Sequence, residues 1–539
     1  MEDDLLELGK ETAKSSLWLT IGQGVSTAIG GLLTIIIARM LEPAGYGLYS
    51  VALIPIMIFS IVRDWGIMFA ATRYISRGLL KTDDPVPKYI STTFFFEITN
   101  GTLLTLLVFL FAHEIAVDFL GKPEAGTLIQ FISIMLLFQG IFVASYAVLN
   151  AFGVTKYIAF SQLIGAIFRT VLTLYLLFTG WGVLGALLGF LSYFVVAGLV
   201  SFFFVIREVI RKSFIYFGLD LKILKEMLIF GSPLMVNALF ETVGLQSLNA
   251  LASNYSTLIE LGNYFAAFAV LTIVVVFNMP LIQALLPSFS KVDTMNNYTS
   301  LYKVYRTSIH FSSLLLIPVI FGLIGLSKPL IFTIYGLNYS EAPLYLMFLS
   351  FAYIALAMGL IPITSFFMGT GSTKEILIGK GSAYFIGLLI ALFMIPIYKI
   401  VGLIIALNII YFISLFNFYI LVKRKFGFSV DYVKLFKIFI ASFIMFLIVY
   451  FYSYLATDKF FTSFELLLSH CGLAKEELIF MAISVLGAII GLFVYSINLA
   501  LLNVLNEDDF NILRHISTAL GPFGKIIKMW MILIKKLKR

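Results

Sequence analysis

Leu314–Leu326 reads LLLIPVIFGLIGL, a run in which no position carries a polar side chain. A strand of a transmembrane barrel alternates apolar and polar residues over about ten positions, so this run excludes a β-barrel. Similar apolar stretches recur from Ser15 to Ala500. About 20 helical residues cross a hydrocarbon core about 30 Å thick. The sequence therefore predicts an all-α polytopic membrane protein.

The amino-acid composition agrees with a membrane protein and excludes several kinds of site and partner. The 539 residues are 60% hydrophobic and 12% charged, whereas roughly one quarter of an average soluble domain is charged. The single cysteine, Cys471, excludes an intramolecular disulfide, and four scattered histidines show no metal-ligand spacing. The net charge of +8 does not indicate nucleic acid, because basic residues of membrane proteins collect beside anionic lipid headgroups. We expect membrane lipids as partners, no nucleic acid and no bound cofactor.

Apolar stretches predict about 14 transmembrane helices. An even number places both termini on one side, and basic residues identify that side as cytoplasmic. Of 37 Lys and Arg residues, 29 fall in or beside segments on the side of the termini, whereas six fall on the opposite side. We therefore predict a multi-pass protein of the cell membrane with both termini cytoplasmic. The expected spans are 15–37, 46–71, 91–112, 127–151, 157–179, 182–206, 227–252, 262–287, 308–327, 343–369, 376–398, 400–422, 435–456 and 478–502.

Short sequence matches recur at offsets between 215 and 218 residues. They occur in the same order and in corresponding expected loops, so they indicate two parallel six-helix lobes. The predicted organisation is an N-lobe at 1–206, a basic cytoplasmic linker at 207–226, a C-lobe at 227–422, two extra helices at 423–502 and a cytoplasmic tail at 503–539. The matching pairs are Gly47–Tyr49 with Gly262–Tyr264, Asn150–Lys156 with Met368–Lys374, and Val183–Gly185 with Ile400–Gly402.

The tail ends in a basic amphipathic segment. Lys525–Arg539 mixes Ile, Met and Trp with Lys and Arg. That mixture is typical of an interfacial helix lying on anionic lipid. A solvated basic tail is the alternative.

Several segments carry a family resemblance. Ile37–Tyr49 reads IARMLEPAGYGLY and is followed by Asp64–Ile67 and Thr72–Ile75, while Leu285–Lys291 ends the eighth expected span. These segments resemble the polysaccharide biosynthesis (O-antigen-type) flippases of the multidrug/oligosaccharidyl-lipid/polysaccharide exporter superfamily. The resemblance extends over the whole chain. It implies a V-shaped pair of lobes that moves a polyprenyl-diphosphate oligosaccharide from the cytoplasmic to the outer leaflet by alternating access.

Ionisable residues inside the expected spans are the candidate site residues. Each costs about 2.5–3.5 kcal/mol at mid-membrane, so such residues usually face a cavity, a partner or water. Arg63 and Asp64 fall in the second span and Glu97 in the third. A guanidinium suits a diphosphate because it presents a planar, bidentate fork of donors. Either Arg63 contacts the substrate, or it pairs with Glu97 or Asp64 to hold the helices together.

Arg169, near the middle of the fifth span, is the strongest candidate for a substrate-phosphate contact. Pairing with Glu97 across the lobe is the alternative for this residue. In the second lobe, Glu241 has Asn237 one turn away on the same helix face. These two residues could take a proton or Na⁺ and couple transport to an ion gradient. A polar packing contact between helices is the other interpretation.

The sequence features bear on three function classes. A flippase for lipid-linked oligosaccharide fits arginines inside the membrane, and glycosyltransferases of the same pathway are candidate partners. An ion-coupled extruder of drugs or organic cations, from the same superfamily, would show acids rather than arginines in its cleft. A membrane-embedded glycosyltransferase or polymerase would need a large outer loop or clustered acid, base or metal ligands, which the sequence lacks. We therefore expect a transporter and not an enzyme.

Overall fold

The computed structural model describes residues 2–79, 85–212, 214, 216–272, 298–459, 476–519 and 524–537; within them, the side chains of 2–21 and of a few further residues are not described. Every regular element in these ranges is a helix, which confirms the all-α class. The chain forms two compact units, Met1–Gly262 and Asn263–Arg539, and each is described by itself.

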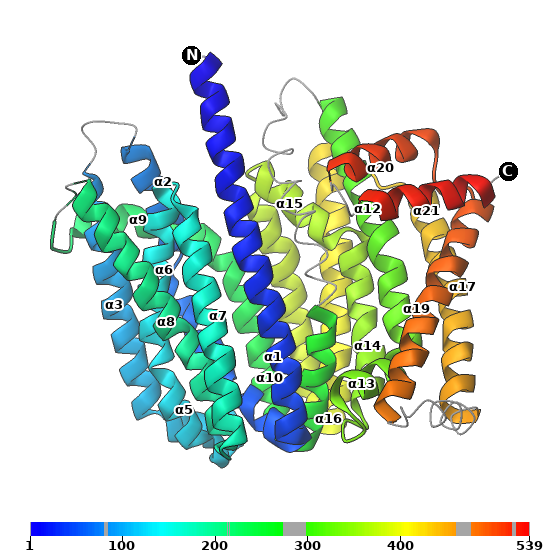
Figure 1. Cartoon of the computed structure of the whole chain (residues 1–539), viewed down its shortest axis with the longest axis horizontal. Helices are drawn as coiled ribbons and strands as arrows, with labels where there is room; N and C mark the ends of the chain where they lie inside the picture. The colour runs from blue at the N-terminus through cyan, green and yellow to red at the C-terminus, as the bar shows by residue number, and fades with distance from the viewer. Residues whose placement is uncertain are drawn as a thin grey trace. The chain divides into compact units, whose positions relative to one another are not determined.

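The first unit begins with α1 (Glu2–Asp64), which contains the first expected span and most of the second. Its backbone leaves helical geometry at Glu42, where φ is 56°, and Pro43 follows. A left-handed residue and a proline without an N–H group interrupt the helical hydrogen bonds at this point. The chain turns back here, so that α2 (Ile67–Gly78) lies toward the same end as the N-terminus (Figure 1). The loop expected between the two spans is therefore a sharp kink.

The rest of the first unit also consists of helices (Figure 1). A π-helical turn, Leu239–Val243, joins the last two of them. These two helices belong to the first compact unit, and the predicted boundary between the lobes, which assigns 227–252 to the C-lobe, stays a prediction. The helices are α3 (Val86–Leu110), α4 (Ala112–Glu114), α5 (Gly126–Ser133), α6 (Met135–Ala151), α7 (Thr155–Phe178), α8 (Gly182–Arg211), α9 (Leu221–Ala238) and α10 (Gly244–Tyr255).

Small residues bring α7 and α8 close together. A Cβ atom added at Gly185 would lie 2.8 Å from the Cβ of Leu176, and one at Gly189 would overlap Thr173. Lipid tails are as apolar as leucine, so helix association in a membrane depends on such close packing. The glycines therefore fix the position of α7, the helix that carries Arg169.

We expect Gly189→Leu to lower the free energy of unfolding by about 1–3 kcal/mol, because the added side chain would overlap Thr173 on α7. Denaturant unfolding of the detergent-solubilised protein measures this change. Gly31→Leu is the matched control, since no neighbour lies within 4 Å of a Cβ at Gly31. Equal destabilisation by both substitutions would contradict the role of close packing.

In the second unit, the long helix α16 (Thr373–Phe426) contains two expected spans. It kinks between them at Lys399, where φ is 51°. A hydrophobic core that includes Tyr305, Phe366 and Phe418 holds helices of this unit together. The predicted tail forms two helices that run across the ends of the upright helices (Figure 1). The other helices are α12 (Tyr298–Gly325), α13 (Ser327–Tyr335), α14 (Ala342–Ala355), α15 (Ile361–Gly369), α17 (Tyr432–Tyr454), α19 (Glu476–Leu501), α20 (Glu507–Ala519) and α21 (Gly524–Leu537).

The described residues contain ten helical segments long and apolar enough to cross a membrane. Two of them, Gly22–Gly78 and Lys374–Phe426, have 57 and 53 residues, and each is more than twice the ~20 residues that one crossing needs. The kinks divide both into two expected spans. The eighth expected span begins in the apolar helix Leu258–Thr272, and 273–297 lie outside the described residues. The count of 14 stays a prediction.

Candidate functional site

Arg63, at the end of α1, forms an ion pair with Glu97 on α3. The two side chains are 3% and 0% exposed. Asn100, one turn further along α3, donates a hydrogen bond of 2.7 Å from Nδ2 to the backbone carbonyl of Arg63. These contacts cross-link α1 and α3. The geometry thus favours the interpretation of Arg63 as a helix-pairing charge, and its contact with substrate stays a prediction.

Asp64 lies at the break between α1 and α2. Its Oδ1 accepts a hydrogen bond of 3.1 Å from the backbone N–H of Met68, in the first turn of α2. The backbone leaves right-handed helical geometry at Trp65 and Gly66, with φ values of 47° and 77°. A carboxylate there satisfies an N–H group that has no partner within the helix. The side chain of Asp64 therefore stabilises the first turn of α2.

Arg169, on α7, is partly exposed and faces α1 and α8. Its guanidinium carbon lies 4.5 Å from the ring centre of Phe190, and the guanidinium hydrogen-bonds to the hydroxyl of Tyr49. A Cβ atom added at Gly30 would lie 3.7 Å from Nη1. Nε is buried without a hydrogen-bond partner. Glu97, the partner that the sequence offered for Arg169, is paired with Arg63 instead. Among the residues that the structure describes, no carboxylate forms an ion pair with Arg169.

A second polar side chain, that of Gln162, lies on the same face of α7 as Arg169. Gln162 lies seven residues before Arg169, which is close to two helical turns, and its Oε1 is buried without a hydrogen-bond partner. Buried polar atoms normally have a partner, so each unpaired one needs an explanation such as an absent ligand or water. Arg169 and Gln162 together present unused donor and acceptor capacity inside the first unit.

Glu241 lies in the π-helical turn between α9 and α10 and is exposed. Such turns occur frequently at functional sites. Further along α10, Asn249 donates to Oε1 of Gln246 at 3.2 Å. The side chain of Asn237 lies outside the described residues. An ion-coupling role for Glu241 and Asn237 stays a prediction.

An apolar cavity of about 530 Å³ lies in the second unit between α12, α17 and α19. Its wall includes Pro318, Val449 and Ala488, and Trp530 of α21 contributes to the same wall. Sequence reasoning did not locate this cavity, because its lining residues are ordinary apolar residues that come from helices far apart in the chain.

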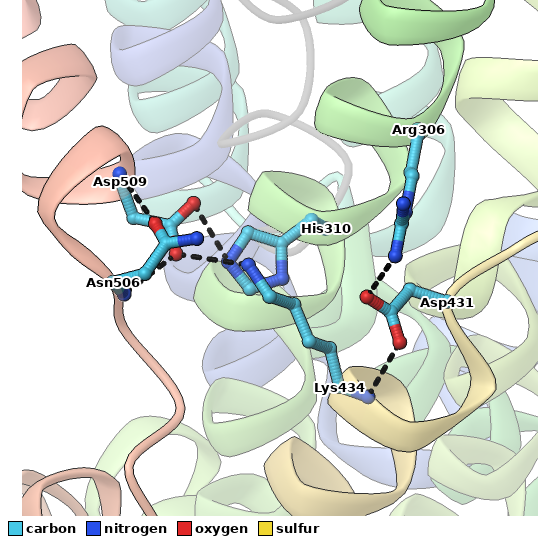
Figure 2. Close-up of polar contacts among 6 residues, drawn as sticks. All are labelled: Arg306, His310, Asp431, Lys434, Asn506 and Asp509. Carbon is cyan, nitrogen blue, oxygen red and sulfur yellow. Dashed lines mark hydrogen bonds and ion pairs between the residues drawn. The ribbon is translucent and has the colours of Figure 1, made fainter.

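A polar cluster in the second unit was also missed (Figure 2). Asp509 of α20 accepts from Nζ of Lys434 at 3.1 Å and lies 3.5 Å from Nε2 of His310. Asp431 accepts from Arg306, and from the backbone N–H of Lys434 at 3.1 Å. Although burial opposes ionisation, these donors hold the pKa of Asp431 below its ordinary value. The spacing of Arg306 and His310, on one face of α12, was the available signal.

A family model described as "Polysaccharide biosynthesis protein" matches residues 36–343. The succinoglycan biosynthesis transport protein ExoT of Rhizobium meliloti (strain 1021) is 25% identical over 321 residues, 57% of this chain and 59% of ExoT. The chain thus spans 59% of the length of the curated relative that it matches.

Two solved structures show the same fold at low sequence identity. The lipid II flippase MurJ, in an inward closed conformation, has a TM-score of 0.71 at 18% identity, over 90% of this chain and 98% of that chain. A multidrug resistance MATE family transporter in an inward-facing conformation has a TM-score of 0.64 at 15% identity, over 77% of this chain and 98% of that chain.

Proposed function

This chain belongs to the polysaccharide biosynthesis protein family, and from that membership we propose that it flips a lipid-linked oligosaccharide across the cell membrane by alternating access. The substrate would be a polyprenyl-diphosphate oligosaccharide that moves from the cytoplasmic to the outer leaflet for cell-surface polysaccharide assembly. Both termini would be cytoplasmic, and glycosyltransferases of the same pathway would supply the substrate. The protein would act as a transporter without covalent chemistry.

Arg169 is the observation that carries this proposal. A charge inside a membrane span costs about 2.5–3.5 kcal/mol, and the described residues supply no carboxylate to neutralise it. Phe190 and Tyr49 hold the guanidinium in place and leave other N–H donors available. A diphosphate would supply the missing negative charge through bidentate hydrogen bonds. An organic cation, the substrate of a drug extruder, would instead be repelled by the positive charge of Arg169.

The apolar cavity supports a substrate with a long hydrocarbon chain. Its lining is almost entirely aliphatic, and the described polar groups at its wall are few: Ser484, Tyr495 and Trp530. Isoprenoid units would bury apolar surface there at about 0.8 kcal/mol per CH₂ group. The substrate head and tail would thus be recognised by different parts of the chain.

Filling this cavity should slow the transfer of long-chain substrate. We expect Ala488→Trp to lower the initial rate about 4- to 15-fold for a long polyprenyl carrier, because loss of one or two buried CH₂ groups is worth about 0.8–1.6 kcal/mol. Transfer of a short-chain analogue should change little. Val485→Trp is the control, since Val485 is 54% exposed on the same helix and does not line the cavity. Equal loss with both chain lengths would show that the tail does not use this space.

The function itself is tested in proteoliposomes. A fluorescent polyprenyl-diphosphate oligosaccharide is placed in one leaflet, and its transfer is followed by chemical quenching from the other side. Transfer that requires the protein supports the flippase. Gradient-driven antiport of a soluble organic cation, with no transfer of lipid-linked sugar, would assign the chain to the drug-extruder class.

The coupling ion is tested in the same vesicles. We propose H⁺ or Na⁺ bound at Glu241, because this carboxylate lies in a π-helical turn within the expected seventh span. Imposing either gradient should raise the transfer rate of the wild type and leave that of Glu241→Gln unchanged. A rate that is independent of both gradients would remove this assignment and leave the flippase proposal standing.

A further inference from the structure

The last two helices pack against the end of a predicted membrane span. In the second unit, α20 and α21 run across the ends of α12, α17 and α19 (Figure 1). Nε1 of Trp530 donates a hydrogen bond of 2.9 Å to Oγ of Ser496, which belongs to the membrane-spanning helix α19. Ser496 lies about 7.5 Å along the helix axis from Leu501, the end of α19, at 1.5 Å per residue. Helix α21 is therefore fastened beside the end of a span and not held out in solvent.

Contacts within the protein set the orientation of these helices. Asp509 ties the first turn of α20 to Lys434 and His310 (Figure 2). Nζ of Lys535 on α21 lies 3.3 Å from the carboxylate of Glu507 and 4.6 Å from the ring centre of Phe510, both on α20. The face that α21 turns away from the protein is thus determined before any lipid is bound.

The two faces of α21 differ in composition. Met531 and Ile534 point inward and are 8% and 0% exposed. Met529 and Ile532 point outward and are 72% and 56% exposed. Three exposed lysines share the outward face at helical spacing: Lys525, Lys528 and Lys536.

This outward face is poorly suited to water. Met529 and Ile532 would expose apolar surface, and like charges on one helix face repel each other. An anionic bilayer surface removes both penalties, because the apolar side chains enter the headgroup layer while the lysine stems extend their ammonium groups to the phosphates. We propose that the outward face of α21 is a binding surface for anionic phospholipid headgroups. The proposal does not depend on what the protein transports.

The full-length protein in nanodiscs allows a direct test. In a Cys471→Ser background, Met529→Cys is labelled with an environment-sensitive dye, and its emission and its quenching by spin-labelled lipid are measured. Discs of phosphatidylcholine are compared with discs that also contain phosphatidylglycerol. We expect a blue shift and several-fold stronger quenching with phosphatidylglycerol, decreasing at high salt. The same dye at Asn511→Cys, an exposed position on α20, is the control and should not respond.

The triple variant Lys525→Glu, Lys528→Glu and Lys536→Glu should abolish the response to phosphatidylglycerol. Because these lysines are exposed, we expect the triple variant to keep the wild-type melting temperature. An unchanged melting temperature would show that the variant is folded. A dye at Met529→Cys that stays equally accessible to water in both kinds of disc would overturn the proposal in favour of a solvated tail or a protein partner. A response that persists in the triple variant would equally overturn headgroup recognition by these lysines.

Discussion

Glu97→Leu is expected to lower the free energy of unfolding by about 3–5 kcal/mol, because it removes the ion-pair partner of the buried Arg63 and leaves Asp64 as the negative charge beside it. Arg63 is 3% exposed and cannot reach water without separating α1 from α3. The free energy is measured by denaturant unfolding in detergent or by steric trapping in bicelles.

The double variant Arg63→Met with Glu97→Leu separates charge from packing. Replacing a whole buried ion pair by apolar residues of similar size is often neutral, so most of the lost stability should return. Lys425→Met is the control for an exposed pair, since Lys425 contacts Glu375 but is 44% exposed, and it should cost less than about 1 kcal/mol. A double variant as unstable as Glu97→Leu alone would show that shape and not charge holds the helices.

Arg169→Ala is expected to reduce the initial flipping rate about 10- to 100-fold. A hydrogen bond to a charged group contributes about 1.5–3 kcal/mol, and each 1.4 kcal/mol is a factor of ten. Arg169→Lys should be intermediate, because an ammonium keeps the charge but not the bidentate fork of donors. The proteoliposome transfer assay measures the rate, and the melting temperature reports whether the variant is folded.

Lys156→Ala is the matched control for Arg169→Ala. Lys156 lies on the same helix and also faces an aromatic ring, that of Tyr157 at 4.9 Å, but it is exposed near the start of α7. Its removal should leave flipping unchanged. Wild-type flipping by Arg169→Ala would eliminate the phosphate contact, and a fall in melting temperature that matches the fall in rate would identify Arg169 as a structural charge.

The long kinked helices show which features of the fold the local sequence predicts. Two apolar stretches interrupted at Glu42 and Pro43 predict two spans, and α1 contains the first and most of the second. Whether the interruption is a loop or a single kinked residue depends on backbone angles, which composition does not encode. The segment 227–252 shows the same limit, because its apolar pattern predicts a span but does not say which helices will cover it.

The candidate site shows a sharper division. Sequence alone identified Arg63, Glu97 and Arg169 as costly charges inside the membrane, and it left open which of the two arginines would take Glu97. The structure pairs Glu97 with Arg63 and surrounds Arg169 with Tyr49 and Phe190. This choice depends on how α1, α3, α7 and α8 are rotated against one another.

What the sequence by itself determined is the class and the family of this protein. Long apolar runs have one stable form in a membrane, the helix, because every backbone N–H and C=O group must find its partner within the segment. The resemblance stated from Ile37–Tyr49 onward is confirmed by the family match over residues 36–343. Only the tertiary structure decided which charges neutralise each other, where the apolar cavity lies and which face α21 turns outward. These properties arise from contacts between residues far apart in the chain, and side-chain type alone does not specify which helices will meet.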